Sequence, residues 1–294
     1  MDPHLLRTFV AVARRASFSG AAEELGYTQS AVSQQIAALE GDLRTTLLHR
    51  RPVALTDAGV RLLEHAEPLL LRIAAARADV ARLAATPATY LVIGVSALAV
   101  TPGFARKLAA VRAERPGAEV TVRVLERAAV PGGVADGTFD LGLVDGVAAP
   151  TDPLHLPDVG PLTALAVACE PLVVLLPAGH PLGGRRGLNL SDLADARWID
   201  APEVAVPLDG LRAASGSDGY RPALRYEGTD VRGLGALAVA GHGLAVLPES
   251  ALGGVPGGVA VPIVAPRLVH RVEILHGGLT GGPAALLAAV LTEA

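Results

Sequence analysis

Residues 17–39 constrain the fold of this chain more than any other stretch. Two short segments with apolar residues at helical spacing flank Gly26, which adopts the positive φ of a tight turn at little cost. Ser19, with acidic residues shortly after it, suits the start of the first helix, and Thr28 suits the start of the second. We therefore predict two helices joined by a sharp turn.

The second helix has an apolar face and a small polar face. Its inward stripe consists of Ala31, Val32, Ile36 and Leu39. Its outward face shows Gln29, Ser30, Ser33 and Gln34. A glutamine amide can pair with adenine, and serines allow close approach to phosphates and base edges. The pattern is typical of a helix that enters a DNA major groove, although a solvated surface helix could show the same residues.

Residues 48–56 predict a short hairpin, or wing, with Arg50 and Arg51 suited to phosphate contacts. Thr56 then caps a long helix that starts near Asp57. Apolar residues recur along this helix at steps of four and three, the heptad spacing of a coiled coil. They are Leu62, Ala66, Leu69, Ile73, Ala76, Val80 and Leu83. This seam favours a partner helix over packing within the chain, and Pro68 should kink the rod.

Composition limits the alternatives. A length of 294 residues suggests two or three units, and a net charge of −4 argues against a general nucleic-acid binder. Residues 1–86 carry a charge of +1 and the remainder −5, so DNA binding must depend on where the arginines lie. The single cysteine, Cys169, permits no internal disulfide; we expect a small buried residue, with a redox sensor as the alternative.

The amino terminus has no secretion pattern, and the apolar stretches are too short to span a membrane, so we expect a cytoplasmic chain. Residues 86–89 should act as a hinge, after which strands and helices alternate. Strands are expected at 90–95, 119–125, 140–145, 172–177, 197–200, 244–247, 259–264 and 268–275. Helices are expected at 102–114, 191–195, 231–240 and 283–292. This alternation predicts two α/β lobes with open, largely parallel sheets and ligand crevices at the strand ends.

The whole chain resembles the LysR-type transcriptional regulators. The specific matches are Phe9–Ala13, Ser17–Ala22, Gln29–Ile36, Leu39–Glu40 and Leu55–Gly59. Weaker matches follow in the family's order at Leu91–Gly94, Phe139–Leu143, His180–Leu182 and Ala240–Pro248. Three departures concern the wing region: Arg44 stands where the family has glycine, Leu48 stands where it has phenylalanine, and the wing itself is about two residues short.

The resemblance implies an α/β protein with a winged helix-turn-helix at 1–59, a dimerising linker helix at 60–86, and an effector domain at 87–294. That domain should have the type 2 periplasmic-binding-protein fold, with lobe one at about 87–160 and 265–294 and lobe two at about 161–264. The expected DNA contacts are Thr28, Gln29, Ser30, Ser33, Gln34, Arg50 and Arg51. The expected partners are promoter DNA, a small metabolite, RNA polymerase and further copies of the chain in a homodimer or homotetramer, with no cofactor and no metal.

The effector contacts are expected at the carboxyl ends of strands and at helix starts. They are Ser96, Ala97, Leu98, Asp145, Asp200, Ala201 and Thr229. A helix start near Ser96 would favour a carboxylate, whereas two acids would favour an amine or a polyol, and the sequence leaves this conflict open. The alternatives are helix capping for Ser96 and Thr229, and solvated loops for the two aspartates. We expect His242 to be a hydrogen-bonded or surface histidine, with a role in the cleft as the alternative.

Enzyme motifs are weak. Gly233–Ala238 imitates a dinucleotide fingerprint but follows no strand, and Gly94–Leu98 lacks the last glycine of a nucleophile elbow. The histidines show no zinc-protease spacing. We therefore expect a regulator rather than an enzyme. Two alternatives are a carboxyl-terminal domain that only oligomerises, and an enzyme fused to a DNA-binding head.

Overall fold

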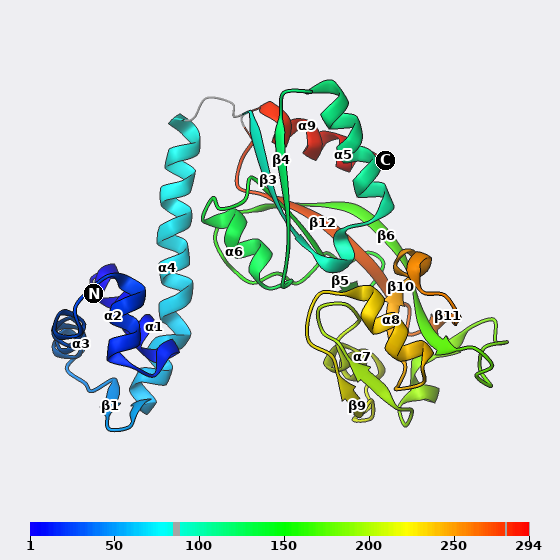
Figure 1. Cartoon of the computed structure of the whole chain (residues 1–294), viewed down its shortest axis with the longest axis horizontal. Coiled ribbons are helices and arrows are strands. Elements are labelled where there is room, and N and C mark those ends of the chain that lie inside the picture. Colours follow the sequence, from blue (N-terminus) through cyan, green and yellow to red (C-terminus); the bar gives the residue numbers. More distant parts are fainter. Residues whose placement is uncertain (85–88, 280, 294) are drawn as a thin grey trace. The chain divides into compact units, whose positions relative to one another are not determined.

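The computed structural model describes residues 1–84, 89–279 and 281–293, without the side chains of residues 79, 82–84 and 254. The chain divides into a head, built from residues 1–78, and a larger carboxyl-terminal unit, built from residues 79–157 and 161–294 (Figure 1). The division falls inside the long helix α4 (Asp57–Ala84). Of the hinge expected at 86–89, only Thr89 lies within the described residues.

The head is a winged helix-turn-helix. Its elements are α1 (Pro3–Arg15), α2 (Phe18–Leu25), α3 (Gln29–Leu43), β1 (Leu48–Arg50), β2 (Val53–Leu55) and the first part of α4. The helices enclose one apolar core that includes Phe9, Val32, Ile36 and Leu39, each fully buried. The turn between α2 and α3 uses Gly26 at φ 69°, and the Thr28 hydroxyl accepts a hydrogen bond from Ala31 N at 3.2 Å, as the sequence predicted.

The cap of α2 differs from the prediction. Ser17, not Ser19, precedes the helix: its backbone is extended, and its Oγ accepts a hydrogen bond from Gly20 N at 3.2 Å. Ser19 already lies in the first turn. A capping oxygen must sit about three residues before the N–H that it satisfies, and Ser17 meets that requirement because the chain turns at Ala16 (φ 47°).

Arg44 stands at a position where the resemblance leads us to expect glycine, and its backbone is strained there. Arg44 ends α3 in the left-handed conformation (φ 53°), which glycine adopts without a penalty and other residues adopt at a cost of about 1–2 kcal/mol. The chain then enters the wing, in which Leu48 pairs with Leu55 and Arg50 with Val53. Leu48 is 1% exposed and fills the place in the core that the family gives to phenylalanine.

Helix α4 continues through Pro68, and its apolar seam has two environments. Ala66 is fully buried in the head's own core and Leu62 packs against that core, so these two positions have an intrachain role. Leu69 and Val80 are 40% and 70% exposed, Ala76 is exposed and Ile73 is half-buried. The side chain of Leu83 lies outside the described residues. No helix in the part of the chain that the structure describes is long and apolar enough to cross a membrane.

The carboxyl-terminal unit has two lobes. Lobe one contains β3 (Tyr90–Ser96), β4 (Glu119–Leu125), β5 (Leu141–Ala148), β12 (Val269–His276), α5 (Pro102–Glu114), α6 (Ala129–Ala135) and α9 (Gly282–Thr292). Its sheet runs β4-β3-β5-β12-β6. Helices α5 and α9 share one core with this sheet, and α6 shares another (Figure 1).

Lobe two contains β7 (Leu188–Asn189), β8 (Trp198–Asp200), β9 (Pro222–Arg225), β10 (Ala245–Pro248), β11 (Gly258–Ala265), α7 (Leu208–Ser215) and α8 (Val231–Val239). Short 3₁₀ turns cover Ala97–Ala99 (η1), Leu190–Leu193 (η2) and Glu249–Gly254 (η3). Among the helices and strands of both lobes, the sequence analysis did not predict α6, α7, β7 and β9. It predicted a helix where η2 lies. The missed elements are short, so their periodicity carries little information.

The lobes are joined by β6 (Thr163–Pro177), and this strand corrects two expectations. Its first part pairs antiparallel with β12, while residues 172–177 pair antiparallel with β10 and β11. The sheet is therefore mixed, rather than largely parallel, and lobe two begins within β6 rather than at residue 161. Cys169, expected to be buried, is exposed on β6, because only the lobe-two end of this strand is enclosed on both faces.

Candidate functional site

The outer face of α3 presents the predicted DNA contacts. Thr28, Gln29, Ser30 and Gln34 are exposed, and Ser33 is half-buried. The neighbouring Gln35 instead faces inward, where its Oε1 accepts a hydrogen bond from Thr8 Oγ1 at 2.5 Å and ties α3 to α1. Of two adjacent glutamines, Gln34 is thus free to read a base, and Gln35 fixes the helix that carries it.

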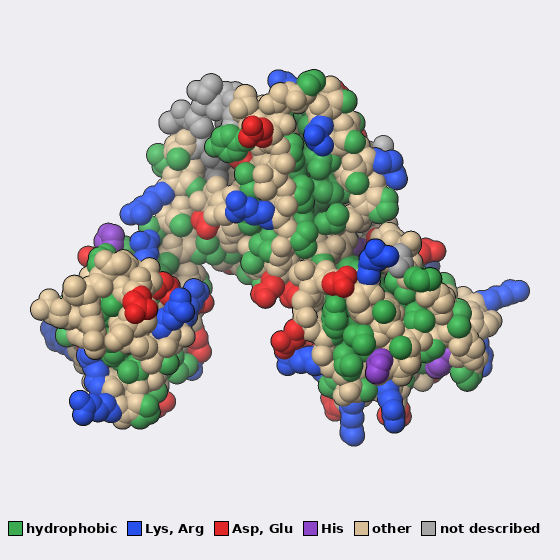
Figure 2. Space-filling model, in the orientation of Figure 1, with side chains coloured by type: hydrophobic (Ala, Val, Ile, Leu, Met, Phe, Trp, Pro, Cys, Tyr) green, Lys and Arg blue, Asp and Glu red, His purple; other side chains and the backbone are tan. Residues whose placement is uncertain are grey.

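The two wing arginines lie in different environments. The guanidinium of Arg50 lies 3.2 Å from Glu40 Oε2 and 4.8 Å from the ring centre of Phe18. Glu40 also accepts a hydrogen bond from Leu47 N at 2.9 Å, so it anchors the wing to α3. Arg51 lies in the turn of the wing and is exposed. Basic side chains project from this end of the head (Figure 2), and the geometry favours Arg51 over Arg50 as a phosphate contact.

A cavity of about 500 Å³ lies between the two lobes of the carboxyl-terminal unit. Its walls are mostly apolar and come from both lobes, with Leu98, Val144 and Leu156 on one side and Ala205 and Val206 on the other. Its titratable lining residues are Arg127, Asp145, His155, Glu203 and His270. A concave, largely apolar space with a few polar groups is the usual form of a small-molecule site.

The structure brings two of the seven predicted effector residues, Leu98 and Asp145, to this cavity. Ala97 lies half-buried in η1, and Asp200 is half-buried at the end of β8. Ala201 is 1% exposed within a lobe-two core, and Thr229 is exposed in the loop before α8. The cap of α8 is Asp230, whose carboxylate accepts hydrogen bonds from Arg232 N and Gly233 N.

Ser96, at the end of β3, forms hydrogen bonds with the neighbouring strand β5. It is fully buried, and its Oγ donates to Leu143 O at 3.4 Å and accepts from Asp145 N at 3.0 Å. The element that follows is the three-residue η1, and α5 begins only at Pro102 with Thr101 as its cap. The predicted helix start near Thr101 and Pro102 is confirmed, but η1 separates it from Ser96, whose hydroxyl is used within the sheet.

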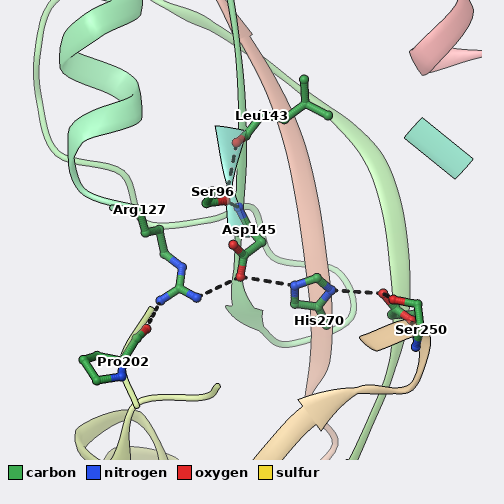
Figure 3. Close-up of polar contacts among 8 residues, drawn as sticks. Ser96, Arg127, Leu143, Asp145, Pro202, Ser250 and His270 are labelled. Atoms are coloured by element: carbon green, nitrogen blue, oxygen red, sulfur yellow. Dashed lines mark hydrogen bonds and ion pairs between the residues drawn. The ribbon is translucent and has the colours of Figure 1, made fainter. Parts of the chain in front are cut away.

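A row of charged side chains crosses the cavity end of the sheet (Figure 3). His270 on β12 lies directly opposite Glu170 on β6. On the other side of β12, His270 lies opposite Val147 on β5, and Asp145 is two residues before Val147 on that strand. Nδ1 of His270 is 3.2 Å from Glu170 Oε1, and Nε2 is 3.2 Å from Asp145 Oδ2. Glu170 also accepts hydrogen bonds from Ser250 N and Ser250 Oγ.

These contacts set the protonation states. Burial alone would lower the pKa of His270, but hydrogen bonds and charge from Asp145 and Glu170 raise it above its ordinary value. Burial alone would raise the pKa of Asp145, yet His270 and Arg127 hold that pKa below its usual range. The pKa of Glu170 is lowered in the same way: burial opposes the shift, and His270 and Ser250 produce it. The contacts therefore favour the imidazolium form of His270 and the carboxylate forms of Asp145 and Glu170.

Arg127 connects the two lobes. From the loop after β4, its guanidinium donates to Asp145 Oδ2 at 2.9 Å in lobe one and to the carbonyl oxygen of Pro202 at 2.6 Å in lobe two (Figure 3). Its backbone N–H donates to Glu203 Oε2 at 2.7 Å. Arg127 thus bonds both lobes at the edge of the cavity.

The sequence reading missed Arg127, Glu170, Glu203 and His270. Arg127 follows a correctly predicted strand, so the argument that selected Asp145 at a strand end could have selected it as well. Glu170 and His270 carry no local signal, because their proximity depends on the pairing of β6 with β12.

These features define a helix-turn-helix protein with a two-lobed ligand-binding unit. Residues 3–60 match the bacterial regulatory helix-turn-helix proteins of the lysR family, and residues 84–285 match the LysR substrate binding domain. The chain belongs to the LysR family.

The chain is similar to regulatory proteins of other bacteria. The chain is 34% identical to a probable hydrogen peroxide-inducible genes activator of Mycobacterium avium over 65% of this chain and 59% of that protein. It is 32% identical to the small neutral protease regulatory protein of Streptomyces coelicolor over 74% of this chain and 65% of that protein. The matches span less than two thirds of either relative's length, and both relatives are named as regulators rather than enzymes.

Among solved structures, full-length CbnR in complex with its target DNA aligns with a TM-score of 0.55 and 22% identity. The alignment covers 99% of each chain. At this identity the likeness shows the fold alone.

Proposed function

We propose that this protein is a transcription regulator that binds promoter DNA sequence-specifically and responds to a small metabolite held between its two lobes. It acts in the cytoplasm as a homodimer or homotetramer, works together with RNA polymerase, and carries out no reaction and needs no cofactor. The observation that carries the proposal is the outer face of α3, where Gln29, Ser30 and Gln34 are exposed at the start of a helix that is fixed from behind by Gln35.

The geometry of α3 supports binding in the major groove. The first turn presents small polar side chains, so the helix can approach base edges closely. Gln34 can bond an adenine through both amide atoms, while Arg51 on the wing contacts phosphate. The head carries little net charge, so these directed contacts, rather than a general positive field, supply the affinity.

Recognition of a two-fold symmetric promoter site requires two heads, and pairing of two α4 helices would hold them together. Leu69, Ala76 and Val80 remain exposed on one heptad seam of a single chain. Pairing of two such seams buries them and fixes the spacing of two DNA half-sites.

The metabolite acts by differential binding to two lobe arrangements. In the arrangement described above, Arg127 bonds Asp145 in lobe one and Pro202 in lobe two. A ligand that contacts Arg127 or its neighbours favours one lobe angle over another, which changes how the paired heads are presented.

Selection of genomic DNA fragments by the purified full-length protein, followed by sequencing, tests the proposal. The expected result is one enriched motif with dyad symmetry. Gln34→Ala should weaken binding to that motif by about 1–3 kcal/mol and relax one base position in each half-site. Glu23→Ala, a change at an exposed position on α2, serves as the control and should leave the motif unchanged. Absence of any enriched motif for the unmodified protein would overturn the proposal.

A further inference from the structure

We propose that the interlobe cavity takes an uncharged, mainly apolar ligand whose polar end carries both a hydrogen-bond donor and an acceptor, as a carboxamide does. The inference rests on the proposed function, in which this cavity is the ligand site, and names the chemical class that it selects. Three features of the cavity carry it: the apolar walls, the pairing of its charges and two atoms without partners.

The walls provide the affinity for an apolar body. A volume of about 500 Å³ falls within the range of small-molecule sites. Leu98, Val144 and Leu156 line it from lobe one, and Ala205 and Val206 from lobe two. Contact with these side chains removes apolar ligand surface from water, which is the main favourable contribution in such a site.

Most of the charges at the polar end are already paired. The Arg127 guanidinium is bonded to the Asp145 carboxylate, and the His270 ring lies between Asp145 and Glu170. Glu203 accepts the backbone N–H of Arg127. A ligand carboxylate would have to displace Asp145 from Arg127, and a ligand ammonium would have to compete with Arg127 and His270 for Asp145. The carboxylate would lose its hydration without gaining a free counter-charge, and the ammonium could turn only to Glu203, which already accepts the backbone N–H of Arg127.

Two atoms in this pairing remain unsatisfied. Among the described residues, Arg127 Nε and Asp145 Oδ1 are buried without a hydrogen-bond partner. Both belong to lining residues, and Asp145 is only 1% exposed. Buried polar atoms without partners are uncommon because each one costs stability. Both atoms are covered in this arrangement, so a ligand reaches them only when the two side chains shift. One is a donor and the other an acceptor, so a carboxamide can then satisfy both: its oxygen accepts from Arg127 Nε, and its N–H donates to Asp145 Oδ1. A carboxylate lacks the donor, and an ammonium lacks the acceptor.

Matched probes test this preference on the full-length protein by calorimetric titration. One set is cyclohexanecarboxamide, cyclohexanecarboxylate and cyclohexylmethylammonium; a second set is heptanamide, heptanoate and heptylammonium. We expect the carboxamide in at least one set to bind about tenfold more tightly than both of its charged counterparts. Tightest binding by a carboxylate or an ammonium would overturn the proposal, and so would the absence of binding by all six probes at about 10 mM.

A variant locates the preference at the charged end. Asp145→Asn leaves the Arg127 charge without its counter-ion, so the affinity ratio of carboxamide to carboxylate should fall by about tenfold. If this variant fails to fold, Glu203→Gln removes a nearby negative charge and keeps the acceptor, and the ratio should fall by about threefold. Asp218→Asn, a change to an exposed acid outside the described lining of the cavity, should leave the ratio unchanged. An unchanged ratio in the folded cavity variants would overturn the proposal.

Gel-shift titration of the same preparations with a selected DNA fragment separates the two proposals. DNA binding without binding of any probe overturns the ligand class and leaves the regulator function in place. Loss of specific DNA binding by the unmodified protein overturns the proposed function, whatever the probes do.

Discussion

His270 Nε2 lies 3.2 Å from Asp145 Oδ2, although the two residues are 125 positions apart in the chain. They meet because β12 pairs with β5 in a register that brings Val272 opposite Asp145 and leaves His270 on the same face of the sheet. Both side chains are almost inaccessible, at 2% and 1% exposure. The pair therefore interacts where water screens little, and its protonation is linked to folding.

The stability of the carboxyl-terminal unit should depend on pH through this pair. The folded-state pKa of His270 is raised, so the stability that the imidazolium contributes is present below its unfolded pKa of about 6.5 and is lost as pH rises through the folded value. Asp145 and Glu170 have lowered pKa values, so their contribution is present above an unfolded pKa of about 4 and is lost as pH falls through the folded values. The window of greatest stability lies between these two limits.

His270→Gln should therefore lower the free energy of unfolding by about 3–5 kcal/mol near pH 6, and by less near pH 9. Urea unfolding followed by the fluorescence of Trp198, the single tryptophan and a fully buried residue of lobe two, measures this difference. His242→Gln, at an exposed position, is the control. A loss that is equal at both pH values would contradict the charged state assigned to His270.

The two wing arginines should differ in their contribution to DNA binding. Arg51→Ala should reduce the salt dependence of operator binding by about one phosphate contact, because Arg51 is exposed in the turn of the wing. Arg50→Ala should reduce it less, because its charge is paired with Glu40. Fluorescence anisotropy at several salt concentrations measures both slopes. The assignment is wrong if Arg50→Ala gives the larger change.

The exposed part of the α4 seam should hold the dimer together. Leu69→Glu and Val80→Glu place charges on positions that a partner helix would bury, so the oligomer should dissociate towards single chains. Sedimentation velocity measures the change in mass. Ala81→Glu alters an exposed position of the same helix outside the seam and should leave the oligomer intact. An unchanged mass for both seam variants would show that the chains associate elsewhere.

Arg44→Gly should stabilise the head. The position has a φ of 53°, which glycine adopts freely, and Arg44 is exposed. The gain should be about 1 kcal/mol after the greater freedom of glycine in the unfolded chain is counted. Hydrogen exchange of the α3 amides measures it as slower exchange. Faster exchange would mean that the arginine side chain stabilises the helix end by a contact of its own.

The parts of the structure that sequence reasoning predicted are those with local causes. Thr28 and Gly26 mark the helix-turn-helix, and α5 and β4 have the bounds that periodicity predicted. The cap at Ser17 was misplaced because Ser19 lies in an almost equivalent local context. Two neighbouring serines differ only in backbone conformation, which the sequence does not display.

The polar network of the cavity could not be predicted, because it depends on strand register. Glu170 and His270 are separated by 100 positions and meet only through the antiparallel pairing of β6 and β12. Ser96 illustrates the same limit: its place at a strand end was predicted correctly, but its hydroxyl is used by the neighbouring strand β5 rather than by a ligand. The interlobe bonds of Arg127 arise only once both lobes are folded.

Reciprocal coupling between ligand and DNA is the most direct test of the central claim, that the interlobe cavity controls DNA binding. The affinity of the full-length protein for its selected DNA fragment is measured with and without a saturating cavity ligand, and the affinity for that ligand is measured with and without the fragment. We predict that the two ratios agree and lie within about 5–150-fold, because coupling free energies are reciprocal. A ligand that occupies the cavity, as shown by a changed affinity for Asp145→Asn, yet leaves the DNA affinity unchanged would contradict the account.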